Sequence, residues 1–194
     1  MGRQPLPPPA SDDDHGADRV IAATRGWIER AVIGQRLCPF AAQPFIDDRV
    51  RYCVSEQRSN AGLLEDLSRE LRALDAADPE QVETTLLIHP QVLTNFLDYN
   101  EFLSECDLAL GTLDLEGTLQ VASFHPSYQF AGTHAGDITN YTNRSPYPML
   151  HILREASIAR AVASFPGVHD IGVRNIETLR RLGHEGWRRL WIDA

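Results

Sequence analysis

The strongest constraint on the fold is the alternation of short apolar runs with longer amphipathic stretches along the first two-thirds of the chain. Residues 50–55 alternate apolar and polar side chains, which predicts a strand with one buried face, suited to the edge of a sheet. Residues 84–88 form a nearly continuous apolar run, as buried parallel strands do, and residues 119–124 form a third predicted strand. Leucines and aromatic residues at helical spacing predict helices over residues 63–74 and 96–110.

This β-α-β-α-β order predicts an α/β fold with a small, mainly parallel, three-stranded sheet and flanking helices. A ferredoxin-like or other α+β arrangement is the alternative, because three strands make a small sheet and a further strand could lie between residues 40 and 50.

Helices are expected before and after this unit. Apolar side chains at helical spacing predict a first helix over residues 18–33. Ser145 followed by Pro146 is a favourable helix start, so a helix is expected over the residues that follow. Residues 175–182 predict a last helix, which Gly183 would end.

The chain is expected to form one domain with a short tail. Its 194 residues are enough for one core. Residues 1–17 combine four prolines with an acidic cluster and offer little to bury, which predicts a disordered tail. Residues 18–194 are then a single globular α/β domain.

Composition excludes several classes of function. The net charge is −9, and all 18 basic residues are scattered arginines, so nucleic acid is not expected as a partner. The absence of lysine excludes Schiff-base and P-loop lysines, and no glycine-rich nucleotide motif is present. No apolar run approaches the roughly 20 residues of a membrane helix and no export signal is seen, so we expect a cytoplasmic protein with free thiols that does not interact with membranes.

A long loop is the first candidate for a functional site. Residues 125–144 have neither a helical nor a strand period, yet they are rich in aromatic and polar residues, which indicates an ordered loop folded over a site. His125 begins this loop directly after a predicted strand, and His89 follows another strand at the same edge of a parallel sheet. Each His-Pro pair could instead serve only as a strand terminator.

Chemical roles follow from these positions. His89, His125 and Cys38, the thiol just after the first helix, are the candidate catalytic residues. Arg144 beside the predicted helix start is the best candidate for binding an anion, with an ion pair to Asp137 or packing on a tyrosine as the structural alternative. The candidate ligand-binding residues are Tyr128, His134, Asp137, Asn143, Arg144, Ser145 and His151.

A zinc-type metal site is a further hypothesis. If the strands that precede His89 and His125 are neighbours, both imidazoles could reach one ion. The third ligand would be Cys38, His134, Asp137 or His151, although the sequence has no C-x-x-C or H-x-x-x-H motif.

Five segments resemble the bacterial proteins grouped as domain of unknown function 1415, over roughly residues 19–190. They are WIERAVIGQRLCPFA, TTLLIHPQVLTNFLDYNEFL, ASFHPSYQFAGT, NYTNRSPYPMLHILREASIARAV and LRRLGHEGW. The resemblance implies small cytosolic bacterial proteins, and it transfers no catalytic residue.

Three functional hypotheses therefore remain open. The first is an enzyme that acts on a small anionic metabolite through a His/Arg site at the carboxyl edge of the sheet. The second is a non-catalytic small-molecule-binding or regulatory module that uses the same pocket. The third is a structural partner protein. Convergence of His89, His125 and Arg144 would favour the first two, and their dispersal would favour the third.

Overall fold

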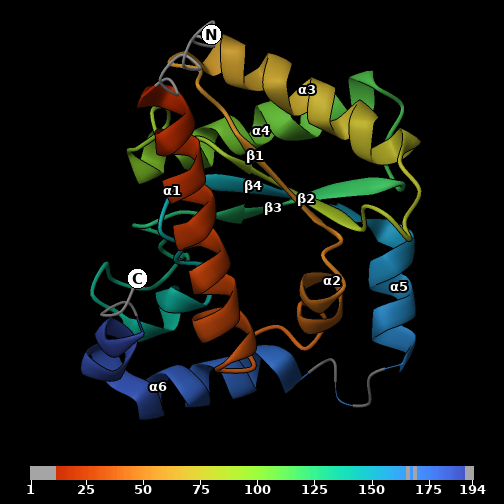
Figure 1. The fold of residues 1–194 in the computed structure, drawn as a ribbon. Helices are drawn as coiled ribbons and strands as arrows, with labels where there is room; N and C mark the ends of the chain where they lie inside the picture. The colour runs from red at the N-terminus through yellow and green to blue at the C-terminus, as the bar shows by residue number, and fades with distance from the viewer. Residues whose placement is uncertain (1–11, 165–166, 168–169, 191–194) are drawn as a thin grey trace, which may run out of the picture.

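The computed structural model describes residues 12–164, 167 and 170–190 (Figure 1). The strands predicted at residues 50–55, 84–88 and 119–124 and the helices between them are present. The elements are α1 (Asp12–Trp27), η1 (Ile28–Ile33), α2 (Ala42–Ile46), β1 (Val50–Val54), α3 (Asn60–Ala76), β2 (Thr84–Ile88), α4 (Phe96–Thr112), β3 (Leu119–Phe124), η2 (Ile138–Thr142), β4 (Met149–Arg154), α5 (Glu155–Ser164) and α6 (Ile171–Arg189).

The sheet has four strands in the order β1-β2-β4-β3 (Figure 1). β2 is parallel to β1, whereas β4 is antiparallel to both β2 and β3. The α/β class is confirmed, but the sheet is mixed, so the prediction of three mainly parallel strands is wrong in detail. Since β4 opposes both neighbours, β1, β2 and β3 all point the same way. Their C-terminal ends share one edge, which we call the carboxyl edge.

The prediction of a helix after Ser145 is wrong, because residues 149–154 form β4 and α5 begins only at Glu155. β4 pairs along its whole length with β2 on one side and β3 on the other. Both faces of this inner strand are covered, so its apolar pattern does not alternate cleanly and fits a helix equally well. Between residues 40 and 50, the sequence left room for a further strand, but the structure has α2 there.

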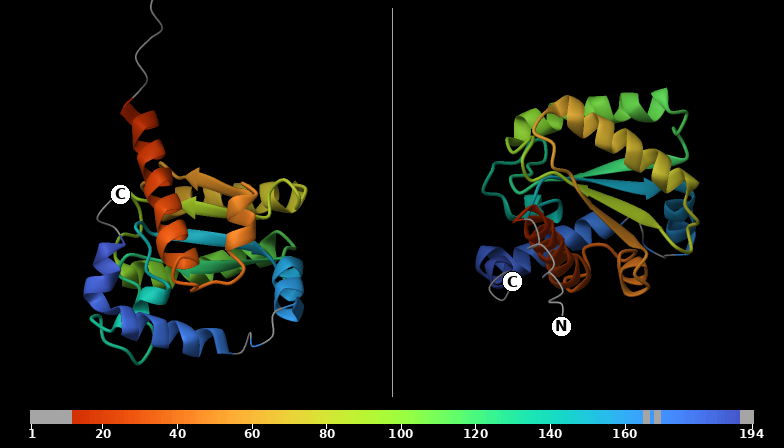
Figure 2. Two further views of the ribbon diagram at one scale, coloured as in Figure 1. Left: turned by 60° about the horizontal axis from the view of Figure 1, so that its bottom comes forward. Right: turned by 45° about the horizontal axis from the view of Figure 1, so that its top comes forward.

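Helices cover both faces of the sheet (Figure 2). α3 and α4 pack on one face, where Leu87 and Ile152 belong to one buried cluster. α1 and α6 lie on the other side, where Leu86, Ile88 and Met149 belong to a second buried cluster. Adjacent residues of β2 alternate between these clusters, which is the period-two pattern of a strand between two layers.

α3 and α4 both begin at the carboxyl edge with a side-chain cap. The Ser59 hydroxyl accepts a hydrogen bond from the Gly62 N–H at 3.2 Å. The Asn95 side-chain oxygen accepts from the Leu97 N–H at 2.9 Å and from the Asp98 N–H. These caps satisfy amide groups that a helix start leaves unpaired, so they fix where both helices begin.

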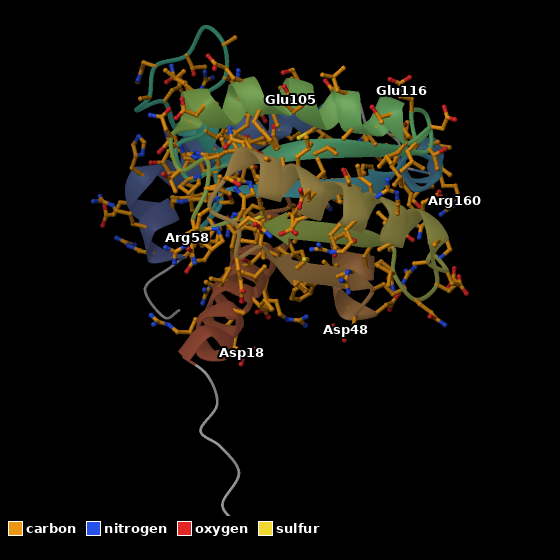
Figure 3. All side chains as sticks on the ribbon, turned by 90° about the horizontal axis from the view of Figure 1, so that it is seen from above. Asp18, Asp48, Arg58, Glu105, Glu116 and Arg160 are labelled. Carbon is orange, nitrogen blue, oxygen red and sulfur yellow. The ribbon has the colours of Figure 1, made fainter. Side chains whose placement is uncertain are left out.

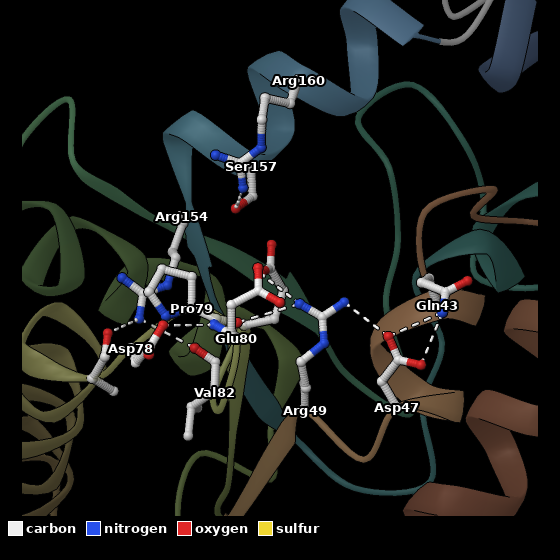
Figure 4. A network of polar contacts seen from close by, with 12 residues as sticks. Gln43, Asp47, Arg49, Asp78, Pro79, Glu80, Val82, Arg154, Ser157 and Arg160 are labelled. Atoms are coloured by element: carbon white, nitrogen blue, oxygen red, sulfur yellow. Dashed lines mark hydrogen bonds and ion pairs between the residues drawn. The ribbon is translucent and has the colours of Figure 1, made fainter.

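The other end of α3 is closed by an arginine from β4 (Figure 4). Arg154 donates from Nη2 to the carbonyl oxygens of Leu74 and Ala77 at 2.7 Å and to that of Val82 at 3.1 Å. A positive charge is favourable at a helix C-terminus, so this contact ties α3 to the centre of the sheet.

The N-terminal boundary differs from the expected one, because α1 begins at Asp12 and residues 12–17 are helical. Residues 1–11 of the predicted tail lie outside the described residues. The expected stop at Gly183 is a break inside α6, with φ 63° and ψ 174°, after which the helix continues to Arg189. Across the described part of the chain, no helix is both long and apolar enough to cross a membrane.

Candidate functional site

His89 and His125 both lie at the carboxyl edge, directly after β2 and β3. The chain that enters β4 runs between them: the His89 N–H donates to the Pro148 carbonyl at 3.0 Å, and the His125 N–H donates to the Asn143 carbonyl at 3.2 Å. β4 therefore separates β2 from β3. The metal site with two histidines required β2 and β3 to be neighbouring strands, and that prediction is wrong.

His89 is fully buried and faces backbone rather than solvent. Its Nδ1 lies 2.9 Å from the Val92 carbonyl oxygen, so Nδ1 carries the proton and donates. Its Nε2 is buried without a hydrogen-bond partner among the described residues. Burial is the main cause that lowers the pKa of His89 to about 4, and His125 lowers it further. The imidazole is neutral at neutral pH.

His125 is also buried, and both of its nitrogens are engaged. Nδ1 accepts a hydrogen bond from the Ser127 N–H at 3.0 Å, so Nε2 carries the proton and donates to the Leu93 carbonyl at 3.2 Å. Burial lowers the pKa of His125 as well. Together the two histidines hold successive carbonyls of the loop between β2 and α4.

Tyr99 of α4 joins the two histidines, and sequence reasoning missed it. Its ring centroid lies 5.8 Å from that of His89 and 5.1 Å from that of His125. The Tyr99 hydroxyl donates to the Met149 carbonyl at 2.8 Å and accepts from the Phe124 N–H at 3.0 Å. The signal was present as an aromatic position on a predicted helix, but nothing in the sequence places that position against two strand ends.

The loop between β2 and α4 forms one wall of the larger cavity at this edge, about 740 Å³ in volume. This cavity, which we call the α3–α4 groove, also takes its walls from the first turns of α3 and α4. Leu93 has a φ of 55°, a left-handed conformation that costs a leucine free energy. The histidine contacts to Val92 and Leu93 help to hold this strained wall in place, together with the packing of both residues in the core.

A second cavity, of about 210 Å³, lies just beyond the end of β3. We call it the Arg144 cavity, and it is lined by Pro126, Tyr141, Arg144, Ser145, Pro146 and Trp187. Trp187 comes from α6, far along the chain, and was not among the predicted residues. Ser145 does not cap a helix, because its hydroxyl donates to the Tyr147 carbonyl at 2.6 Å.

Arg144 is held by neutral groups. Its Nε donates to the Tyr128 carbonyl at 3.2 Å and its Nη2 to the Ala135 carbonyl at 2.6 Å. The guanidinium carbon lies 4.3 Å from the centroid of the Tyr141 ring, a cation–π contact. Among the described residues, no carboxylate forms an ion pair with Arg144. Of the two structural alternatives, the ion pair with Asp137 is therefore absent, and packing on a tyrosine is present.

The loop of residues 125–144 is ordered by its own side chains, as predicted. Buried Asn140 accepts from the Phe130 N–H at 3.0 Å and from the Thr133 hydroxyl at 2.8 Å, and it donates to the His134 carbonyl at 2.9 Å. Asp137 caps η2 by accepting from the Thr139 N–H at 2.9 Å. These contacts connect the turns of the loop that leads to Arg144.

The other predicted residues have structural contacts. The Asn143 amide donates to the Ser123 carbonyl at 3.1 Å, and His134 is exposed. His151 lies on β4 with Nε2 2.8 Å from the Thr84 hydroxyl, and burial lowers its pKa to about 4. Burial raises the pKa of the Cys38 thiol, which opposes formation of the thiolate that a nucleophile requires.

The described residues do not form a set of metal ligands. In the ranges that the structure describes, no three His, Cys, Asp or Glu side chains are grouped so as to hold an ion. His134, Asp137, His151 and Cys38 therefore do not complete a site with the two edge histidines.

Comparison with known proteins agrees with the resemblance seen in the sequence. No curated protein and no solved structure gave a match. One family model, described as a protein of unknown function (DUF1415), matches residues 19–189, which includes both cavities and all the histidines discussed above. The chain therefore belongs to the DUF1415 family.

Proposed function

We propose that this protein binds a small organic anion in the Arg144 cavity. The observation that carries the proposal is a guanidinium that is fixed in place without being neutralised. Two backbone carbonyls and the Tyr141 ring orient Arg144 at the wall of a cavity, and none of the described carboxylates pairs with it. A preoriented arginine fork loses little entropy when it binds a carboxylate or phosphate.

The rest of the lining indicates the chemistry of the ligand. Tyr141 and Trp187 contribute aromatic surface, their ring centroids being 5.1 Å apart, and two prolines add rigid apolar surface. A volume of about 210 Å³ suits a small molecule. We therefore favour a carboxylate attached to a flat or apolar body over inorganic phosphate, because only the former would cover the rings.

The protein acts in this proposal as a binding module rather than through histidine catalysis. His89 and His125 are buried and donate to loop carbonyls, and neither of them lines the Arg144 cavity, so neither reaches a ligand bound there. General acid–base work requires a group within hydrogen-bond reach of the reacting proton. The histidines instead shape the carboxyl edge. We place the protein in the cytoplasm, where Cys38, Cys53 and Cys106 stay reduced thiols.

Thermal-shift titration tests the site. Benzoate, acetate, succinate and phosphate are compared, and we expect benzoate to stabilise the protein most. A ligand at about 100 times its dissociation constant adds about 2.7 kcal/mol to the free energy of unfolding. Arg144→Gln should abolish the shift, and Arg144→Lys should weaken it because a lysine lacks the fork.

Arg160→Gln is the matched control, since Arg160 is an exposed arginine on α5 that contacts Ser157. It should keep the full shift. A shift that survives Arg144→Gln, or one that Arg160→Gln also removes, contradicts the proposal.

A further inference from the structure

The α3–α4 groove lies at the carboxyl edge and has a mixed polar and apolar lining. Leu64, Val92, Leu93 and Phe102 supply its apolar lining, and the two histidine contacts described above hold the Val92–Leu93 wall. The residues around this lining are exposed and polar, including Gln91, Thr94 and Asn95. The groove is independent of the Arg144 cavity, with which it shares no lining residue.

One wall of the groove is negatively charged. Asp98, Glu101 and Glu105 lie on one side of α4 at i, i+3 and i+7, which at 1.5 Å per residue spaces them about 4.5 and about 6 Å along the helix axis. All three are exposed, and none forms an ion pair with a described residue. Figure 3 looks down on both helices and labels Glu105 on α4 and Arg58 just before α3.

Two acidic residues on α3, by contrast, form ion pairs within the protein. Asp66 accepts from Arg69 at 2.8 Å, and Glu70 accepts from Arg51 at 2.7 Å. Arg58, the basic residue of the groove, forms no ion pair with a described residue, and the three carboxylates of the α4 wall outnumber it. The groove therefore combines apolar surface with a net negative charge that no ion pair among the described residues neutralises.

We infer that the α3–α4 groove docks a short, extended, basic peptide segment of a partner protein, with apolar side chains on its floor and arginine or lysine side chains along Asp98, Glu101 and Glu105. A segment of alternating basic and apolar residues matches both features, because successive side chains of an extended chain point to opposite sides. The same carboxylates repel phosphate groups, which disfavours nucleic acid and nucleotides in the groove.

Fluorescence anisotropy of labelled peptides tests the inference on the full chain. A short peptide of alternating arginine and leucine should bind, and its affinity should fall as salt rises from about 0.05 to about 0.5 M. The same peptide with glutamate for arginine should not bind. The double variant Glu101→Gln, Glu105→Gln should weaken binding at least about tenfold.

Asp107→Asn is the matched control, because Asp107 is an exposed carboxylate on α4 that does not line the groove. It should leave the affinity unchanged. Leu64→Gln, in the apolar lining, should weaken the arginine–leucine peptide but not a peptide of alternating arginine and serine. Circular dichroism melts confirm that each variant is folded.

Three results would overturn the inference. The first is that the arginine–leucine peptide does not bind. The second is that Asp107→Asn loses as much affinity as the double variant. The third is that the arginine–serine peptide or spermine binds as tightly as the arginine–leucine peptide and that Leu64→Gln has no effect. The last result would mean that the wall attracts small cations without a docking groove for peptides.

Discussion

At the scale of single residues, the surroundings of each charged side chain show whether it stabilises the fold or can bind an external ligand. Burial alone would raise the pKa of Glu70, but its bidentate contact with Arg51, at 2.7 and 3.1 Å, lowers the pKa below the ordinary value. This pair is internally satisfied and holds α3 against the edge strand β1. Arg144 and Glu101 lack such partners among the described residues, so their charges remain free for an external ligand.

Burial of His89 predicts a loss of stability in acid. Its folded pKa of about 4 lies below the ordinary value of about 6.5, so between these pH values the unfolded chain binds a proton that the folded chain does not. The free energy of unfolding should therefore fall as pH decreases from about 6.5 to about 4, by up to about 1.4 kcal/mol per pH unit for this group. Urea titrations across this range measure the slope.

His89→Asn should reduce that slope, because it removes the titrating group and keeps a donor for the Val92 carbonyl. His151 titrates in the same range, so its replacement should reduce the slope separately. His134→Gln, at an exposed position, is the control and should not change the slope. A His89→Asn slope equal to that of the parent would show that this histidine is not buried in its neutral form.

At the scale of single elements, capping and side-chain tethers decide where the helices of the site begin and end. Ser59 and Asn95 start α3 and α4 at the carboxyl edge, which places both N-terminal turns beside the groove. At the opposite end, Arg154 donates to the carbonyls of Leu74 and Ala77 in the last turn of α3 and just after it. The position of α3 thus depends on a residue from β4, which is almost eighty residues away in the chain.

Removing this tether should destabilise the protein. Arg154→Met keeps much of the side-chain volume but removes the Nη2 contacts to three carbonyl oxygens, which should cost about 2–3 kcal/mol in the free energy of unfolding. Urea denaturation measures the change. Arg160→Met, at an exposed arginine on the neighbouring helix α5, should change it by less than about 0.5 kcal/mol. Equal effects of both substitutions would contradict the capping role.

At the scale of the whole molecule, β4 contributes side chains to the hydrophobic clusters on both faces of the sheet. It pairs with β2 and β3, and its residues alternate between the cluster under α3 and α4 and the cluster under α1 and α6. Leu150 and Ile152 face the first of these clusters, and Met149 faces the second.

A cavity in this strand should affect the whole fold. Ile152→Ala should lower the free energy of unfolding by about 2–5 kcal/mol, because the side chain is fully buried between covered faces. Leu108→Ala on α4 is the control, since that leucine is 64% exposed, and it should cost well under about 1 kcal/mol. Chemical denaturation should show one transition for both variants, and a second transition in Ile152→Ala would mean that the two layers unfold independently.

Sequence alone determined the elements that local periodicity and local signals define. β2 and β3 have the predicted bounds, and α3 and α4 cover the predicted helical segments, because apolar spacing, caps and the His-Pro stops act within a few residues. It also identified Arg144 and the two edge histidines as residues of one edge. The two histidines directly follow predictable strands, whereas Arg144 was placed beside a helix start that the structure does not have.

Only the tertiary structure decided β4, the strand order and the two cavities. Residues 149–154 are apolar on both sides, and pairing with β2 and β3, distant in sequence, makes them a strand. Tyr99 and Trp187 reach the edge through packing of whole helices. The acidic side of α4 becomes the wall of a groove only because the first turn of α3 lies opposite it. Such contacts join residues far apart in the chain, and their free energy is gained only after the fold has brought them together.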